Sequence, residues 1–169
     1  MKQNIIVILI VFLGLFGVLW WGKSVQKPIS STPGANAKTE GVSTLSVPET
    51  FYDFGKISMK NGNVSKMFRV TNSSDKEINL QSVTTSCMCT VAYVVNGENK
   101  KGPFGMPGHG GPVARANEKI PAGESREIEV VYDPNAHGPA GVGSIDRFIY
   151  LVDDAGGKTT LEIKALVTP

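Results

Sequence analysis

The sequence predicts an all-β protein, an immunoglobulin-like β-sandwich of about seven strands preceded by one N-terminal transmembrane helix. Three observations support this prediction. Apolar and polar residues alternate in several short segments after residue 47, as in strands that pack one face on a core. Clusters of Gly, Pro, Asn, Asp and Ser separate these segments. No apolar helical repeat of useful length follows the N-terminal segment, and roughly 120 residues suffice for such a sandwich.

The first 22 residues are typical of a signal anchor. Residues 5–21, IIVILIVFLGLFGVLWW, contain no charged residue, and lysines lie on both sides of them. Their length is at the short end of what spans a bilayer as a helix, and Trp20 and Trp21 suit the membrane interface. The alternative is a signal peptide cleaved after GANA, although that site lies far beyond the apolar core. We expect a single-pass protein of the cytoplasmic membrane, held by residues 5–21, with its C-terminal domain on the extracytoplasmic side.

A linker and one domain follow the anchor. Residues 23–46 are rich in Ser, Thr, Pro and Gly and lack hydrophobic periodicity, which predicts a flexible linker. The domain is expected at 47–169. Its clearest strands have apolar residues at every second position: VSKMFRVTN, EINLQSV, SREIEVVYDP and LEIKALV. The turn sequences NSSDK, IPAGES and DDAGGK lie between segments of this kind.

Three motifs follow one another along this domain: FYDFGKI, then GNVSKMFRVTNSSDKEINLQSVTTSCMCT, then IPAGESREIEVVYDP. In this order they resemble domain-of-unknown-function family 1573, a bacterial family of exported, Hydin-type immunoglobulin-like modules. The resemblance covers about residues 50–167, and SCMCT is its most specific element. Met88 stands where the family usually has glycine, and 96–117 is a long insertion. The resemblance implies a fold and an exported location, and it brings no established activity.

The only two cysteines, Cys87 and Cys89, are separated by one residue in SCMCT. In one unbroken strand over 83–95 they would share the apolar face, where a free cysteine behaves as a small hydrophobe. Their Cβ atoms would then lie roughly 6–7 Å apart, too far for a disulfide, which needs about 4 Å. However, the apolar residues change phase between Leu80 and Val83, which indicates a bulge or a crossing between sheets, and a bend near Cys87 would bring both sulfurs together. Burial, a bridge or a metal would each protect the pair in an oxidising compartment.

The insertion at 96–117 adds two further candidate ligands. It is so rich in glycine and proline that we expect neither a strand nor a helix there. Its segment FGMPGHGG places Met106 and His109 three residues apart, soon after the cysteines. Thiolate, thioether and imidazole groups suit Cu(I) and, less well, Zn(II). The hypothesis is therefore a metal site, with copper as the candidate metal, formed by Cys87, Cys89, Met106 and His109; the alternative is a structural thiol pair under a plain loop.

The sequence shows no catalytic constellation, and we expect no enzyme. His137 lies in the turn DPNAHGPAG and is interpreted as a solvated loop histidine. The 17 basic and 15 acidic residues are scattered singly, so nothing indicates nucleic-acid binding. The first hypothesis is a non-catalytic binding or structural module with an unidentified protein partner. Copper or other soft-metal binding is the first alternative, and thiol–disulfide redox chemistry by the cysteines alone is the second.

Overall fold

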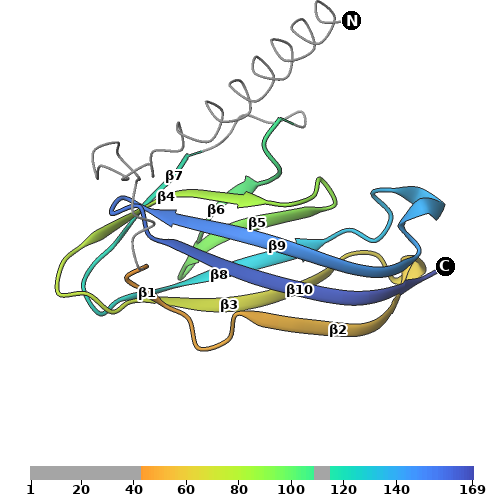
Figure 1. Cartoon of the computed structure of the whole chain (residues 1–169), viewed down its shortest axis with the longest axis horizontal. Helices are drawn as coiled ribbons and strands as arrows, with labels where there is room; N and C mark the ends of the chain where they lie inside the picture. Colours follow the sequence, from red (N-terminus) through yellow and green to blue (C-terminus); the bar gives the residue numbers. More distant parts are fainter. Residues whose placement is uncertain (1–42, 109–114) are drawn as a thin grey trace, which may run out of the picture. The chain divides into compact units, whose positions relative to one another are not determined.

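The computed structural model describes residues 43–108 and 115–169 (Figure 1). In these ranges ten strands form two five-stranded sheets, and the only helical elements are the 3-10 turns η1 (Met59–Asn61) and η2 (Gly138–Gly141). The predicted all-β class is confirmed, with ten strands in place of about seven. The predicted transmembrane helix, 1–22, lies outside the described residues. Within them, no helix has the length and apolar character needed to cross a membrane.

Each sheet is built mainly from antiparallel pairs. In the first sheet, all neighbours are antiparallel, in the order β1 (Leu45–Ser46), β3 (Val64–Asn72), β8 (Ser125–Tyr132), β5 (Thr90–Asn96) and β6 (Asn99–Phe104). In the second sheet, the order is β2 (Phe51–Ser58), β10 (Lys158–Thr168), β9 (Gly143–Asp153), β4 (Ile78–Thr85) and β7 (Arg115–Ile120). Its first pair, β2 with β10, is parallel. The short strand β1 lies at the end of the segment predicted as linker.

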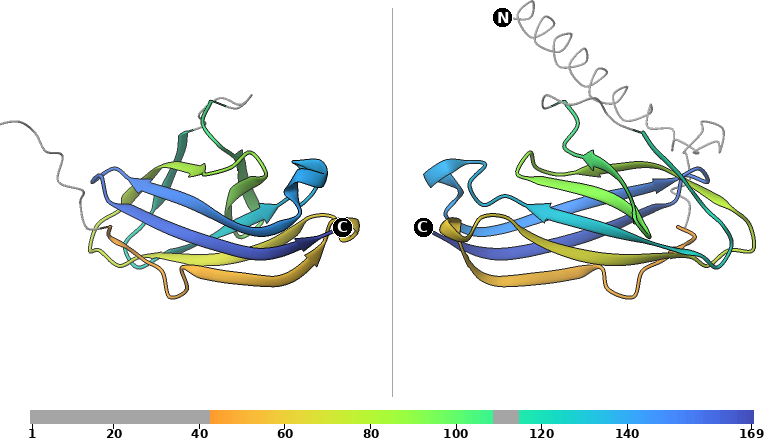
Figure 2. Two further views of the ribbon diagram at one scale, coloured as in Figure 1. Left: turned by 45° about the vertical axis from the view of Figure 1, so that its right-hand side comes forward. Right: turned by 180° about the vertical axis from the view of Figure 1, so that it is seen from behind.

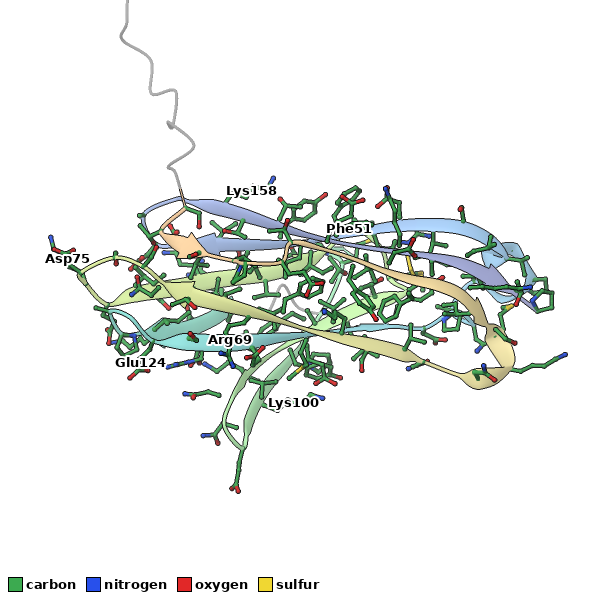
Figure 3. All side chains as sticks on the ribbon, turned by 90° about the horizontal axis from the view of Figure 1, so that it is seen from below. Phe51, Arg69, Asp75, Lys100, Glu124 and Lys158 are labelled. Atoms are coloured by element: carbon green, nitrogen blue, oxygen red, sulfur yellow. A yellow bond between two sulfur atoms is a disulfide. The ribbon has the colours of Figure 1, made fainter. Side chains whose placement is uncertain are left out.

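The core lies between the two sheets, and Figure 3 shows side chains filling this space. The alternation expected from the sequence is present: Phe68 and Val70 of β3, and Ile128 and Val130 of β8, are at most 1% exposed. Leu161 and Ile163 of β10 are fully buried on the opposite side of the core. Since burying one such side chain is worth roughly 1.5–3 kcal/mol, this apolar layer is what holds the sheets together.

The predicted change of phase occurs within β4. The pairing of β4 with both of its neighbours shifts register between Leu80 and Ser82. Ile78 and Leu80 are buried before the shift, and Val83 and Thr85 are buried after it. The bulge thus returns the side chains after it to the core face.

The unbroken strand considered over 83–95 does not exist. Strand β4 belongs to the second sheet and β5 to the first, so the chain crosses between the sheets at 86–89. The buried residues of β5 are Thr90, Ala92 and Val94, whereas Val91 and its odd-numbered neighbours in β5 are only half buried. The core face considered for an unbroken strand, which holds both cysteines, therefore does not continue into β5, because the crossing shifts the buried positions by one residue.

The expectation of neither strand nor helix at 96–117 is also wrong. Gly97, with φ +57°, turns the chain between Asn96 and Asn99, and β6 follows as the second strand of a hairpin with β5 (Figure 3, beside Lys100). Gly102 permits the close approach within this hairpin, since a Cβ there would lie 2.8 Å from a ring carbon of Tyr93. Glycine thus serves the turn and the packing of a strand pair here, in place of forming a loose loop.

A group of ion pairs joins the two sheets along one side. Glu118 of β7, in the second sheet, accepts hydrogen bonds from Arg126 of β8 and Lys101 of β6, both in the first sheet, each at 2.9 Å. The side chain of Arg126 is 6% exposed and that of Glu118 is 16% exposed. Burial alone would raise the pKa of Glu118, but the hydrogen bonds and charges of Lys101 and Arg126 outweigh it and hold that pKa below its ordinary value.

We expect Glu118→Gln to lower the free energy of unfolding by about 1–3 kcal/mol at neutral pH. Because the pKa of Glu118 is lower in the folded state, its stabilising effect is fully present above the unfolded-state pKa of about 4.3 and is lost as the pH falls through the folded-state pKa. Urea unfolding from pH 7 to pH 3 should therefore show a difference that shrinks with acid. The exposed pair of Glu77 with Lys119 supplies the control, Glu77→Gln, with an expected effect below about 1 kcal/mol. A pH-independent difference for Glu118→Gln would contradict this account.

Candidate functional site

The crossing between the sheets is a tight turn with well-defined backbone contacts. The backbone N–H of Ser86 donates to the carbonyl of Phe148 at 2.9 Å, and the N–H of Phe148 donates to Oγ of Ser86 at 2.9 Å. The N–H of Thr90 then donates to the carbonyl of Cys87 at 3.2 Å, which closes the turn. These contacts attach the start of the turn to β9 and its end to β5.

Thr85 supports the same turn from inside the protein. Its side chain is buried, and its hydroxyl lies 3.0 Å from the carbonyl oxygen of Cys87 and 2.9 Å from that of Thr90, so it can donate to either. The backbone N–H of Asp133, just after β8, donates to the carbonyl of Cys89 at 2.9 Å. The turn is therefore held by both sheets.

Cys87 and Cys89 form a disulfide in this turn, and their Cα atoms lie 5.3 Å apart. That separation is normal for a disulfide. A straight strand would have kept the sulfurs apart, and the bend considered from the sequence is what brings them together. Met88 between them is 54% exposed.

Each sulfur of the disulfide faces a different nitrogen-bearing side chain. Nε2 of His137 lies 3.3 Å from Sγ of Cys87, and Nε–H of Arg147 donates to Sγ of Cys89 at 3.2 Å. The backbone N–H of Cys89 also points to Sγ of Cys87, at 3.3 Å. Cys89 is 2% exposed, Cys87 is half buried and His137 is exposed. The two sulfurs therefore differ in both accessibility and neighbours.

The β8–β9 connection carries His137 to the disulfide. It starts with an Asx turn in which the side chain of Asp133 accepts the N–H of Asn135 at 2.8 Å. The N–H of Gly138 donates to the carbonyl of Asn135 at 2.9 Å, and η2 follows directly (Figure 2). Gly138 has φ +54°, a backbone conformation that glycine adopts without strain. Local turn chemistry thus places the imidazole at this end of the sandwich.

Arg147 reaches the disulfide from β9, and its Nη1 donates to the carbonyl of Asp146 at 2.8 Å. Its charge also acts on Tyr132, which lies opposite Thr90 in the β5–β8 pairing and is 1% exposed. Burial raises the pKa of Tyr132, the Arg147 guanidinium opposes the rise and Asp133 adds to it. With its pKa above its ordinary value, the phenol stays neutral at neutral pH, which leaves Arg147 as the permanent charge beside Cys89.

The structure brings together two of the four metal ligands expected from the sequence and places a further candidate ligand beside them. Cys87 and Cys89 are together, and His137 joins them, since one ligand atom from each lies within 4.8 Å of the others. His109 lies outside the described residues. Met106 is half buried and follows Gly105, whose carbonyl accepts the N–H of Thr85 at 3.3 Å. The backbone next to Met106 is thus tied to the strand that leads into the cysteine turn.

His137 was missed because the sequence was interpreted only locally around it. It is exposed, as expected of a loop histidine, but it is not merely solvated. The end of β8 lies beside the start of β5, where Tyr132 is opposite Thr90. A predicted antiparallel pairing of these two strands would have placed the loop after Tyr132 next to the cysteines.

Two surface hollows among the described residues lie elsewhere. One, of about 420 Å³, is lined by residues of β5, β6 and β7, and the other, of about 470 Å³, lies over β2, β9 and β10. Neither lining includes Cys87, Cys89, His137 or Arg147. The disulfide and its two neighbouring side chains thus lie apart from both hollows.

The described residues thus define a β-sandwich domain with a disulfide, half buried at Cys87 and buried at Cys89, at a crossing between its sheets. A model of the family described as protein of unknown function (DUF1573) matches residues 45–104, a segment that includes both cysteines. The match confirms the family resemblance of the sequence over these residues. A search of curated proteins found no significant match.

Two solved structures with TM-scores of 0.50 or more, the first two described below, show a similar fold at low sequence identity. A protein of unknown function from Porphyromonas gingivalis W83 is 17% identical with a TM-score of 0.53, over 80% of this chain and 51% of that chain. A family 123 glycoside hydrolase from Clostridium perfringens is 6% identical with a TM-score of 0.50, over 70% of this chain and 23% of that chain. The PapD-like domain 7 of human CEP192 is 9% identical with a TM-score of 0.47, over 84% of this chain and 92% of that chain. The chain thus spans about half the length of the first protein, and the likeness concerns the fold alone.

We expect Thr85→Val to destabilise the turn that holds the disulfide. The substitution keeps the size of the side chain but removes the hydroxyl shared by the carbonyls of Cys87 and Thr90, and the loss of a hydrogen bond costs about 0.5–1.5 kcal/mol. Urea unfolding of the oxidised protein measures this loss. The control is Thr84→Val, a half-buried neighbour on the other face of β4, with an expected change below about 0.5 kcal/mol. Equal effects of the two substitutions would show that the hydroxyl of Thr85 does not support the turn.

Proposed function

We propose that the chain is a membrane-anchored, extracytoplasmic immunoglobulin-like module whose Cys87–Cys89 pair is a reversible thiol–disulfide couple. One observation carries the redox part of this proposal: Arg147 donates to the sulfur of Cys89 while His137 lies against the sulfur of Cys87. A disulfide with a purely structural role needs no such groups. Cationic and N–H-donating neighbours are what stabilise the thiolates formed when a disulfide is reduced.

The proposed location is supported by two independent features of the chain. Residues 5–21 have the length and composition of a membrane anchor. The disulfide is the form that a cysteine pair takes and keeps in an oxidising, extracytoplasmic compartment. The two-sheet architecture and the family match support an immunoglobulin-like module, which presents the disulfide at one end of the domain.

Accessibility assigns different roles to the two sulfurs. Cys87 is half buried and Cys89 is 2% exposed, so an incoming thiolate reaches Sγ of Cys87. The bond between the sulfurs breaks as the new one forms, and its electron pair goes to Sγ of Cys89. Arg147 is already in place to stabilise this leaving thiolate. The product of this first step is a mixed disulfide between Cys87 and the partner.

A second thiol of the partner completes the exchange. It attacks the partner's own sulfur in the mixed disulfide and releases Cys87 as a thiolate, which takes up a proton beside His137. The net result is that a partner dithiol is oxidised to a disulfide while the pair takes up two electrons and one proton, with Cys87 ending as a thiol and Cys89 as the thiolate beside Arg147. Because Arg147 stabilises the reduced side of this equilibrium, it makes the pair a stronger oxidant.

The Arg147→Gln variant tests this proposal. We expect a reduction potential about 30–60 mV more negative than that of the unchanged protein, because a hydrogen bond to a charged group contributes about 1.5–3 kcal/mol and 30 mV corresponds to about 1.4 kcal/mol. Equilibration of the full chain with reduced and oxidised glutathione, followed by thiol alkylation and mass measurement, gives the potential.

Arg69→Gln supplies the matched control, because Arg69 is 67% exposed and pairs with Glu127 on the outside of the first sheet (labelled in Figure 3). Its potential should equal that of the unchanged protein. Equal potentials for Arg147→Gln and Arg69→Gln would contradict the role of Arg147. A disulfide that can be reduced only when the protein unfolds would overturn the proposed function and leave a binding or structural module.

A further inference from the structure

We propose that the reduced form binds one Cu(I) ion through Cys87, Cys89 and His137. This inference rests on the proposed function in one respect, since the disulfide must first be reduced in the folded protein. It replaces His109 of the sequence hypothesis with His137, which the fold brings to the cysteines from a loop some 50 residues away.

The three ligand atoms already lie at distances that one ion could bridge. Both sulfurs and one imidazole nitrogen lie within 4.8 Å of one another. Three ligands arranged in a plane around a metal, with bonds of about 2.0–2.3 Å, are roughly 3.5–4 Å apart. Reduction of the disulfide releases the sulfurs from bonding distance, while the turn still holds both backbones. Only small side-chain movements are then needed to place an ion between the three atoms.

The composition of the set favours Cu(I) over harder ions. Two thiolates and an imidazole are soft to intermediate ligands, and no Asp or Glu of the described residues joins the cluster. Structural Zn(II) sites use four protein ligands, and this set supplies three.

The net charge of the site also favours Cu(I) over Zn(II). Two thiolates and Cu(I) carry a net charge of −1, which the adjacent Arg147 guanidinium neutralises. The same ligands with Zn(II) would form a neutral complex, which would leave the charge of the half-buried Arg147 guanidinium without compensation. Arg147 is thus a positioning residue for the copper complex, since its N–H would donate to a metal-bound sulfur and orient it.

Copper binding and the disulfide exclude each other. In the oxidised form the two sulfurs are bonded together and offer no thiolate to a metal. A dithiol reductant converts the disulfide to the Cys87 thiol and the Cys89 thiolate and is itself oxidised to a disulfide. Cu(I) then displaces the remaining thiol proton as it binds. Reduction of the module is thereby linked to metal capture, and oxidation to metal release.

Anaerobic competition between the full chain and the Cu(I) chelator bathocuproine disulfonate tests the inference. The reduced protein should take up one Cu(I) per chain, and the oxidised protein should take up none. Cys87→Ser and Cys89→Ser should each weaken Cu(I) binding by about 100-fold or more, and His137→Asn by about 10-fold or more, whereas His109→Asn should change it by less than about 2-fold. Circular dichroism establishes that each variant is folded.

The outcomes separate this inference from the proposed function. If the disulfide is reversible and Arg147→Gln shifts its potential, but the reduced chain takes no copper from the chelator, only the copper site is wrong. Equal weakening by His109→Asn and His137→Asn, or one copper shared by two chains, would overturn the ligand set. Should the disulfide resist reduction in the folded protein, both proposals fail.

Discussion

The structure depends on one constraint: the chain must pass from the second sheet to the first between β4 and β5 within a few residues. Strand β4 ends at Thr85 and β5 begins at Thr90, so a short turn over residues 86–89 makes the crossing. It is stabilised by Ser86, which exchanges two hydrogen bonds with the backbone of Phe148, and by the buried hydroxyl of Thr85. A turn this tight brings side chains two residues apart onto one side, which is why Cys87 and Cys89 can bond to each other.

The crossing also explains the neighbours of the sulfurs. Since β5 pairs with β8, the loop after β8 lies beside the start of β5, and this loop carries His137. Since the end of β4 pairs with the middle of β9, where Thr85 lies opposite Ile149, Arg147 of β9 lies beside the turn that follows β4. One sulfur therefore faces a residue that follows the first sheet, and the other faces a residue of the second sheet. Arg147 beside the sulfur of Cys89 is the basis of the proposed redox role, and His137 beside the sulfur of Cys87 is the basis of the proposed copper site.

Sequence reasoning worked where a pattern is local. The period of two identified β3, β8 and β10, and the change of phase between Leu80 and Val83 appears as the bulge in β4. Sequence reasoning failed in the insertion at 96–117, because a high content of glycine and proline does not exclude strands: Gly97 makes the turn of the β5–β6 hairpin. Sequence reasoning could not identify His137 for a different reason: the position of His137 depends on the pairing of β5 with β8, two strands far apart in the sequence. Arg147, in the middle of a strand, carried no local signal at all.

The most direct test of the account is the reaction of two single-cysteine chains with oxidised glutathione. Cys87 carries the more accessible sulfur and Cys89 the protected one, because Cys87 is half buried and Cys89 is 2% exposed. In the folded full chain, the Cys89→Ser variant, which retains Cys87, should form a glutathione adduct at least about 10-fold faster than the Cys87→Ser variant, because burial limits access to Cys89 by more than the Arg147 guanidinium favours its thiolate. Mass spectrometry of the adducts over time gives both rates. Equal rates, or a faster adduct at Cys89, would contradict the division of roles between the two sulfurs.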